Sequence, residues 1–473
     1  MSNEMGSDLS LTPSQSSYGQ APSATHPAAS GVVGAAYMPP WEPEGEISRP
    51  YAGREQEASR DVRIAYYSPM PPERTGIADY SALLLPALRE RLDVTVVRRG
   101  RKKAPRGTHV SLYHVGNNPD AHAWIVDALR RRPGVVVLHD FVLHHLVAGM
   151  TIGRRDGHGY LDVMEREHGV VGRLLGHGVL DKRIPPLWES RPGDFPLASF
   201  VLEHATGVTV HSRAVHDLVR ASGYAGRVWI VPHPAWPVPA IAPERVAEGP
   251  VIGCFGVVNS SKRVPELLRA TARVRERHPE VTLLLVGPIS PGFDLDRRLQ
   301  RLGLGSEGLV REGWADEQRL WALMAGADVS VNLRFPTMGE TSGSVIRALS
   351  LGKPLVVSDV GWFAELPDAV ALKVPVGDDE VETLVAGLEL LALRPDVREE
   401  MGAAGIELAR REHDLGRVAE RYAAALEEAA GGGAVGDAVL REVSEAAADV
   451  GISADAAEAR EIARRLAEVE LGT

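Results

Sequence analysis

One stretch, residues 328–359, constrains the fold more than any other part of the 473-residue sequence. It contains two short apolar runs of strand length, Val329–Leu333 and Leu355–Ser358. Between them, Thr341-Ser342-Gly343 can cap a helix over Ser344–Leu351, because Ser and Thr side chains accept hydrogen bonds from the first N–H groups of a helix. Strand, helix and strand form a parallel βαβ unit, and folds built from such units bind ligands at the carboxyl ends of their strands.

The polar loop inside this stretch indicates what such a ligand would be. Glu340 stands immediately before the capping triplet, so a carboxylate and a helix N-terminus occur at the same strand end. The N–H groups of a helix N-terminus attract an anion, and carboxylate oxygens accept hydrogen bonds from hydroxyl groups. An anion beside hydroxyl groups is typical of a sugar phosphate or a nucleotide sugar. An ordinary capped helix without a ligand remains the alternative at this point.

Composition excludes several other functions. The formal net charge of −11 argues against a general nucleic-acid binder. Cys254 is the only cysteine, so no internal disulfide can form, and a reducing cytoplasm is the simplest location. No uninterrupted apolar run reaches the roughly 18 residues of a membrane-spanning helix, and the Ser/Pro/Ala-rich N-terminus does not resemble a signal peptide. We therefore expect a cytoplasmic protein.

The alternation of strands and helices occurs twice along the chain. It predicts an α/β protein with two Rossmann-like, doubly wound domains that face each other across a cleft, joined by the proline-rich segment Pro232–Pro237. Before the end of the first domain, a helix is expected over Leu197–Thr206. The predicted segments are a disordered Ser/Pro/Ala/Gly-rich tail (1–60), an N-terminal domain (61–237), a C-terminal domain (238–412), a further helix (413–430) and a Gly-linked, Ala/Glu-rich helical tail (431–473).

Two strand ends in the first domain carry candidate site residues. Gly76 stands between the first strand and a helix, where a missing Cβ lets a phosphate approach backbone N–H groups; an ordinary turn glycine is equally consistent. His139 ends a buried strand, and Asp140 either orients it or caps the next helix. A metal site made of His139, His144 and His145 is disfavoured because no fourth ligand is apparent and the spacing matches no zinc pattern.

Two further features of the first domain allow alternative interpretations. The basic run Arg98–Arg106 is either a solvated loop or a contact with an anionic membrane face, which would place the protein peripherally at the inner surface of the membrane. Trp188, in a proline-rich loop, either contacts an acceptor or packs in the core.

The second domain supplies cations for the cleft. Lys262 and Arg263 follow a predicted strand, at the same edge of the sheet as Glu340. Two cations and a helix N-terminus can balance the charge of a departing diphosphate without a metal ion. A solvent-exposed pair of basic residues is the alternative.

These motifs together resemble the retaining glycosyltransferases of family 4, within the group 1 glycosyl transferases, which have the GT-B fold. The resemblance covers about residues 62–427. The matching pieces are Pro71-Pro-Glu-Arg-Thr-Gly-Ile-Ala-Asp-Tyr80, Val136-Val-Leu-His-Asp140, Phe255-Gly-Val-Val-Asn-Ser-Ser-Lys-Arg263, Gly339-Glu-Thr-Ser-Gly343, Gly352-Lys-Pro354 and Ser358-Asp-Val-Gly361.

The resemblance implies a role for each matched residue. Gly76 corresponds to the glycine near the phosphates, His139 to the histidine that contacts the transferred sugar, Lys262 to the lysine on the diphosphate, and Glu340 to the first of two glutamates, which binds sugar hydroxyls. His139, Lys262 and Glu340 are the predicted catalytic residues. The complete predicted donor site comprises Gly76, Lys262, Arg263, Glu340, Thr341, Ser342, Gly343, Ser344, Arg347 and Glu365, and the predicted acceptor residues are Asp79, Asp140 and Trp188.

Two positions depart from the family pattern. The arginine that usually precedes the lysine is replaced in Val257-Val258, so Arg263 is expected to supply the second positive charge. The second glutamate is absent, and Arg347 stands near its position with a spacing one residue short. We therefore expect either Arg347 or Glu365 to contact the ribose.

The resulting functional prediction is a hexosyltransferase of polysaccharide biosynthesis or a related pathway. It would move a hexose from a nucleotide-diphosphate sugar to a glycan, lipid-linked or small-molecule acceptor with retention of configuration, with no cofactor besides that co-substrate and no metal ion. The helix at 413–430 would cross back onto the first domain. The alternatives are another GT-B enzyme, such as a nucleotide-sugar epimerase or a sugar phosphorylase, and a non-catalytic nucleotide-sugar-binding module.

Overall fold

A computed structural model describes residues 62–431 except 102 and 306, together with residues 443, 446, 447, 449 and 451–453. The predicted disordered tail (1–60) and most of the predicted helical tail (431–473) lie outside the described residues. The described residues belong to one compact unit of the chain.

Six parallel strands form a sheet within the described residues 62–231, in the order β2-β1-β3-β4-β5-β6. The strands are β1 (Arg63–Tyr67), β2 (Asp93–Val96), β3 (Val110–Val115), β4 (Gly134–Leu138), β5 (Ala205–Val210) and β6 (Arg227–Ile230). The helices are α1 (Gly76–Arg89), α2 (Pro119–Arg131), α3 (His144–Met150), η1 (Ile152–Arg154), α4 (Gly157–Leu180), α5 (Leu187–Ser190), η2 (Pro192–Asp194), α6 (Ser199–Leu202) and α7 (Arg213–Ala221).

A second sheet of six parallel strands lies within the described part of residues 251–374, in the order β12-β11-β10-β7-β8-β9. Its strands are β7 (Val251–Phe255), β8 (Thr282–Val286), β9 (Leu309–Glu312), β10 (Val329–Asn332), β11 (Leu355–Ser358) and β12 (Ala371–Val374). The helices that follow are α8 (Val264–Arg277), α9 (Leu295–Leu302), α10 (Glu317–Gly326), α11 (Gly343–Ser350), α12 (Gly361–Glu365), α13 (Glu380–Leu393), α14 (Pro395–Glu412) and α15 (Leu415–Ala430).

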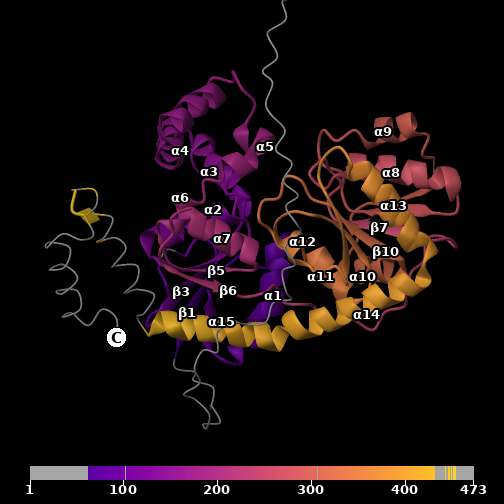
Figure 1. Cartoon of the computed structure of the whole chain (residues 1–473). Helices are drawn as coiled ribbons and strands as arrows, with labels where there is room; N and C mark the ends of the chain where they lie inside the picture. Colours follow the sequence, from indigo (N-terminus) through magenta and orange to yellow (C-terminus); the bar gives the residue numbers. More distant parts are fainter. Residues whose placement is uncertain are drawn as a thin grey trace, which may run out of the picture. The chain divides into compact units, whose positions relative to one another are not determined.

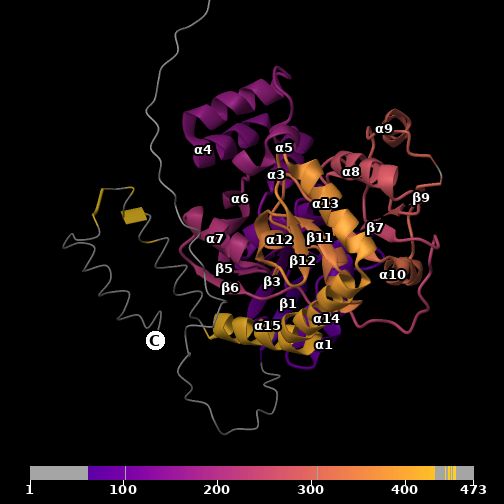
Figure 2. The ribbon, with the colours of Figure 1, turned by 45° about the vertical axis from the view of Figure 1, so that its right-hand side comes forward.

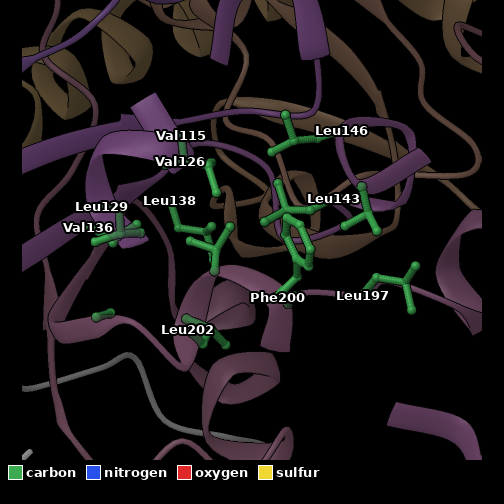
Figure 3. Packing of buried hydrophobic residues seen from close by; sticks show 14 of the residues in the cluster. Val115, Val126, Leu129, Val136, Leu138, Leu143, Leu146, Leu197, Phe200 and Leu202 are labelled. Carbon is green, nitrogen blue, oxygen red and sulfur yellow. The ribbon is translucent and has the colours of Figure 1, made fainter. Parts of the chain in front are cut away.

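Each sheet is covered by helices on both faces, which explains why the strands are nearly continuous runs of apolar residues. On one face of the first sheet, Leu138 of β4 packs in a cluster with Leu146 of α3 and Phe200 of α6, and Figure 3 shows these side chains from close by. Each buried side chain of this kind contributes roughly 1.5–3 kcal/mol by leaving water. This double burial holds the strand ends, and the loops that follow them, in fixed positions.

The strand order reverses once in each sheet, and ligands bind in α/β folds beside such a reversal. In the first sheet β1 lies between β2 and β3, and in the second β7 lies between β10 and β8. The loops that leave β1 and β3 carry Gly76 and Asn117, and the loops that leave β7 and β10 carry Lys262 and Glu340. The topology therefore brings most of the predicted site loops to two strand reversals.

The last two described helices connect the two sheets. α14 packs on α11 beside the second sheet (Figure 1). α15 packs on α1 and β3 of the first sheet (Figures 1 and 2). Tyr422 of α15 and Tyr80 of α1 are both buried, and their hydroxyl groups form a hydrogen bond of 2.7 Å. Gly402 allows α14 to approach closely, because a Cβ there would lie 2.2 Å from the carbonyl oxygen of Gly352.

The helix predicted at Leu197–Thr206 is wrong beyond Leu202, where α6 ends. Ala205 instead begins β5 and pairs with Gly134 at the start of β4. The local pattern favoured a helix, but the open edge of β4 offers hydrogen bonds to a parallel strand, and tertiary pairing overrides local propensity.

Candidate functional site

A cavity of about 240 Å³ is lined by residues from the loops of both sheets, including residues of α1 and α11. These two helices are labelled in Figure 1. The first sheet and its loops contribute Thr75, Gly76, Ile77, Asp79, Tyr80, Asn117, Asn118, His122, His139, Asp140 and His211. The connecting segment contributes His233 and Trp236, and the second sheet contributes Glu340, Thr341, Gly343 and Arg347. We refer to it below as the central cavity. It contains predicted residues from both domains.

The N-terminus of α1 opens onto this cavity. Thr75 caps the helix, and its side-chain oxygen accepts a hydrogen bond from the N–H of Ala78. A Cβ added to Gly76 would meet no atom within 4 Å. Packing within the protein therefore does not require glycine at this position, and the space above it is available to a ligand.

Glu340 is held firmly at the opposite wall. One carboxylate oxygen, Oε2, accepts hydrogen bonds from the N–H of Met338 at 2.7 Å and the hydroxyl of Thr337 at 3.0 Å. The other, Oε1, lies 2.6 Å from Nε of Arg334. A carboxylate accepts about four hydrogen bonds, so the group retains capacity for a ligand hydroxyl while its position is fixed.

The loop that carries Glu340 also contacts the first half of the chain. The carbonyl oxygen of Met338 accepts hydrogen bonds from the N–H groups of Phe141 and Val142, at 2.7 and 3.0 Å. These two residues follow Asp140 directly. The contact therefore aligns the carboxyl end of β4 with the carboxyl end of β10.

Lys262 lies behind the loop and is not among the residues that line the cavity. Its side chain is 9% exposed, and Nζ donates a hydrogen bond to the carbonyl oxygen of Phe255. Gly256 makes room for it, since a Cβ there would lie 2.3 Å from Nζ and the backbone has a φ of +102°. Burial, followed by the charge of Arg334, lowers the pKa of Lys262 to about 8.

Arg263 is not brought to the cavity. Its guanidinium is paired with the buried carboxylate of Glu380 and with Glu266. Its charge is therefore already balanced. Arg334, the second residue after β10, is the cation that acts on both Glu340 and Lys262. Sequence reasoning missed Arg334, although its place at a strand's carboxyl end was a usable signal.

The N-terminus of α11 has the predicted capping. The hydroxyl of Ser342 accepts from the N–H of Val345, and Ser344 accepts a 2.7 Å hydrogen bond from the side-chain amide of Asn332. Ser342 and Ser344 are therefore occupied with the fold, and neither lines the cavity. Thr341 does line it, and its buried hydroxyl has no hydrogen-bond partner among the described residues.

His139 is the centre of a chain of buried imidazoles. Its Nε2 lies 3.0 Å from Nδ1 of His114, and its Nδ1 lies 3.3 Å from Nε2 of His211. Nδ1 of His211 lies 2.8 Å from the carbonyl oxygen of Val231. A carbonyl oxygen can only accept, so this Nδ1 of His211 carries its proton.

The remaining protons of the chain follow from that assignment. Burial lowers the pKa of His139 and of His114 well below the usual value, and burial lowers the pKa of His211 to about 4, so all three rings are neutral at pH 7. His139 then donates from Nδ1 to His211 and accepts at Nε2 from His114. Both ring nitrogens of His139 are engaged within the protein, and the ring is fixed as a neutral group.

Asp140 lies beside this chain. Its Oδ2 accepts a hydrogen bond of 2.8 Å from the N–H of Asn117. Burial, followed by the charge of Glu340, raises the pKa of Asp140 to about 7. The carboxyl groups of Asp140 and Glu340, one from each half of the chain, therefore face the same cavity.

Arg347 forms the remaining wall. Its guanidinium lies 3.7 Å from the centroid of the Trp236 ring, a cation–π contact, and 3.8 Å from a carboxylate oxygen of Glu317. The charge of Asp79 also acts on it. Trp236 was predicted only as part of a linker, so sequence reasoning missed its contribution to the cavity.

Glu365 and Trp188, which were also predicted as site residues, lie outside the central cavity too. The carboxylate of Glu365 accepts hydrogen bonds from the N–H groups of Arg213 and Ala214 at the start of α7, at 3.1 and 2.6 Å. Trp188 packs against His144 and Tyr160, with ring centroids 5.5 and 6.4 Å away. His122, His211, His233, Asn117 and Asn118 line the cavity instead, and sequence reasoning missed them.

Comparison with solved structures identifies the fold. Two solved structures superpose on 78% of this chain with TM-scores of 0.54 and 17% identity: sucrose-phosphate synthase from Thermosynechococcus elongatus, of which 98% is covered, and the Anabaena protein Alr3699/HepE in complex with UDP and glucose, of which 100% is covered. The fold is GT-B. The predicted fold class is thereby confirmed.

Sequence comparison points in the same direction. Residues 249–392 match the family model described as "Glycosyl transferases group 1". The chain is 26% identical over 372 residues to the 2-deoxystreptamine glucosyltransferase of Streptomyces kanamyceticus, a match that covers 70% of this chain and 92% of that protein. These similarities support the group 1 part of the predicted family. In the described part of the chain, no helix is long and apolar enough to cross a membrane.

Proposed function

We propose that this protein is a retaining glycosyltransferase of the family 4 type, which transfers a hexosyl group from a nucleotide-diphosphate sugar to a hydroxyl group of an acceptor. One observation carries the proposal. The fixed carboxylate of Glu340 and the loop before α11 face the open N-terminus of α1 across the central cavity. This is the combination of hydroxyl acceptor and anion-binding N–H groups that a sugar diphosphate requires.

The donor proposed first is UDP-glucose. The neighbouring Anabaena structure holds UDP and glucose, and the Streptomyces relative is named a glucosyltransferase. Arg347 and Trp236 would contact the nucleoside, because an arginine stacked on an indole offers both hydrogen-bond donors and an apolar surface. The acceptor would be a glycan, a lipid-linked glycan or a small polyol.

The reaction would break the bond between the sugar C1 and the diphosphate oxygen and form a bond between C1 and the acceptor oxygen on the same face. The acceptor proton would pass to the departing diphosphate oxygen, so no covalent bond to the enzyme is needed. Lys262 and Arg334 would stabilise the negative charge that develops on the diphosphate. Glu340 would hold the hydroxyl groups of the sugar, and Asp140 those of the acceptor.

His139 would form part of the wall of the sugar pocket, in a fixed orientation, without accepting or donating a proton during the reaction. Both of its ring nitrogens are used by His114 and His211. A neutral ring beside the sugar avoids placing a positive charge next to a carbon that becomes positive in the transition state. Burial, which lowers the pKa of His139, keeps the ring neutral for this role.

The decisive experiment is a donor screen with UDP-, GDP- and ADP-sugars, each with and without Mg²⁺, followed by release of the nucleoside diphosphate. We expect one nucleotide to be strongly preferred and a new glycoside to form when polyols or glycans are added. The anomeric proton coupling of the product, measured by NMR, tests retention of configuration. An isomerised donor or a sugar phosphate as product would instead indicate an epimerase or a phosphorylase, and tight donor binding without any turnover would indicate a binding module.

A further inference from the structure

A second cavity, of about 490 Å³, lies on the first sheet, between the segment that joins β2 to β3 and the end of α2. Five basic residues line it: Arg101, Lys103, Arg106, Arg131 and Arg132. We call it the basic cavity. None of its lining residues also lines the central cavity. The two cavities are therefore separate sites.

The basic cavity contains no acidic side chain among its described lining residues. None of its five cations forms an ion pair with another described residue. In contrast, Arg154, which lies nearby on η1, pairs with Asp127 of α2 at 2.8 Å. In a chain with a net charge of −11, five unpaired cations around one cavity repel one another unless an anion joins them.

The floor of the cavity is structured. Tyr67 is 4% exposed, and its ring stacks on Tyr113 with a centroid separation of 4.5 Å. Burial raises the pKa of Tyr67, whereas the charges of Arg132, Arg131 and Arg101 act in the opposite direction. Three guanidinium groups thus lie near one phenol. Arg132 is further fixed by a hydrogen bond of 3.0 Å to the carbonyl oxygen of Thr108.

We propose that the basic cavity binds a phosphoryl group that carries at least two negative charges, such as a phosphomonoester or a pyrophosphate. A single carboxylate would balance only one of the five cations, whereas a doubly charged group engages several. Guanidinium groups match phosphate oxygens with two parallel hydrogen bonds, and four of the five cations are arginines. The same chemistry is present in a soluble phosphorylated molecule and in a phosphorylated lipid headgroup. The proposal does not depend on the proposed sugar transfer.

Calorimetry with inorganic pyrophosphate tests the site. We expect the Arg106→Ala/Arg131→Ala variant to bind at least about tenfold more weakly than the wild type, because two charge-assisted contacts are lost. The Arg301→Ala/Arg410→Ala variant removes the same charge from exposed positions elsewhere and should change the affinity by less than about twofold. Lys262→Met, which removes a cation behind the central cavity and leaves the basic cavity intact, should also retain binding to the basic cavity.

Two results would overturn the proposal: absence of pyrophosphate binding, or binding that the Arg106→Ala/Arg131→Ala variant leaves unchanged. Equal thermal melting temperatures of the variants exclude misfolding as the cause of a loss. Loss of pyrophosphate binding in Lys262→Met alone would locate the bound pyrophosphate at the central cavity. The experiment therefore tests the two sites independently.

Sedimentation with vesicles distinguishes the two sources of the ligand. Phosphatidylcholine vesicles that contain phosphatidic acid should pull down the wild type, and pyrophosphate should release it, if the ligand is a lipid headgroup. Pyrophosphate binding without any pull-down assigns a soluble ligand. Equal pull-down by phosphatidylserine vesicles of matched charge, insensitive to pyrophosphate, would show unspecific attraction to a charged surface and would contradict a phosphoryl site.

Discussion

The two sides of the central cavity differ in charge. The side formed by the first sheet presents His122, His139 and His211, and the connecting segment adds His233. Burial lowers the pKa of all four. The side formed by the second sheet carries Glu340 and Arg347, with Lys262 and Arg334 behind them. Neutral imidazoles are thus concentrated on one side, which we call the neutral side, and the cations on the other, which we call the charged side. The neutral side also carries the carboxyl groups of Asp79 and Asp140, and burial raises the pKa of both.

This difference suggests how the work is divided. A diphosphate with several negative charges needs cations, and these come from the second sheet. The acceptor hydroxyl needs well-positioned partners without positive charge, and these come mainly from the first sheet. Substitutions on the charged side should therefore reduce turnover strongly, and substitutions on the neutral side should reduce it less.

The largest expected effect is that of Glu340→Ala. The carboxylate is fixed by Met338, Thr337 and Arg334, so its removal eliminates a preorganised contact to the sugar. We expect kcat with the preferred donor to fall at least about 100-fold, a loss of roughly 2.7 kcal/mol of transition-state stabilisation. Glu400→Ala, at an exposed position on α14, is the matched control. Transfer at the wild-type rate by Glu340→Ala would contradict the assignment.

The next largest effect shows whether Arg334 or Arg263 supplies the second positive charge for the diphosphate. Arg334→Met should lower kcat/KM about 30-fold because it removes a cation beside Lys262. Arg263→Met should change kcat/KM less than about threefold, since the Arg263 charge is already balanced by Glu380. Steady-state kinetics of both variants decide between them. A larger loss of kcat/KM in Arg263→Met than in Arg334→Met would show that Arg263 is the second cation.

A pH profile tests the charge on Lys262. Its pKa is lowered to about 8, so the ammonium is present below that pH and is lost above it. A negatively charged diphosphate binds the protonated form, so kcat/KM for the donor should fall about tenfold per pH unit well above pH 8. Lys262→Arg keeps its charge in this range and should remove that limb of the profile. A limb that is unchanged in Lys262→Arg would arise from another group.

A smaller effect is expected on the neutral side. His211→Leu leaves the proton on Nδ1 of His139 without an acceptor, which costs about 1–3 kcal/mol of stability for a buried donor. We expect kcat to fall about fivefold, or roughly 1 kcal/mol of transition-state stabilisation. His211→Gln retains an acceptor at this place and should restore most of the rate. Nitrogen-15 NMR of His139 should show the proton on Nδ1 in the wild type, and a proton on Nε2 would contradict the proposed chain.

The smallest effect concerns the backbone at α1. Gly76→Ala adds a Cβ where no protein atom lies within 4 Å, so the melting temperature should stay unchanged. If the diphosphate approaches this backbone, KM for the donor should rise about threefold through steric exclusion alone. Gly305→Ala, also in open space, is the control. An unchanged KM in Gly76→Ala would mean that the ligand does not approach this N-terminus.

Part of the fold and part of the candidate site could be predicted from the sequence alone. The βαβ units and the residues just after strands, such as Gly76, His139 and Glu340, could be predicted because apolar runs are local and strand ends converge at one edge. The side chains that contact the site residues could not be predicted. The balance of Arg263 by Glu380 depends on a contact between α8 and α13, and the imidazole chain joins β3, β4 and the end of β5.

The position of Trp236 shows the same limit. The sequence Pro232–Pro237 indicates a connection between domains, and nothing local indicates that its indole meets Arg347 of α11. Likewise, the run Arg98–Arg106 predicted either a solvated loop or a contact with an anionic membrane face. Nothing local indicated that Arg131 and Arg132, at the end of α2, line a cavity together with residues of this run. Side-chain pairing over long sequence distances requires the three-dimensional structure.

The most direct test of the division between charged and neutral sides is the affinity for UDP, measured by calorimetry on the wild type, Lys262→Met and His211→Gln. We predict that binding at the central cavity is at least about tenfold weaker in Lys262→Met and nearly unchanged in His211→Gln. Equal affinity of the wild type and Lys262→Met for UDP would contradict the placement of the diphosphate at the second sheet.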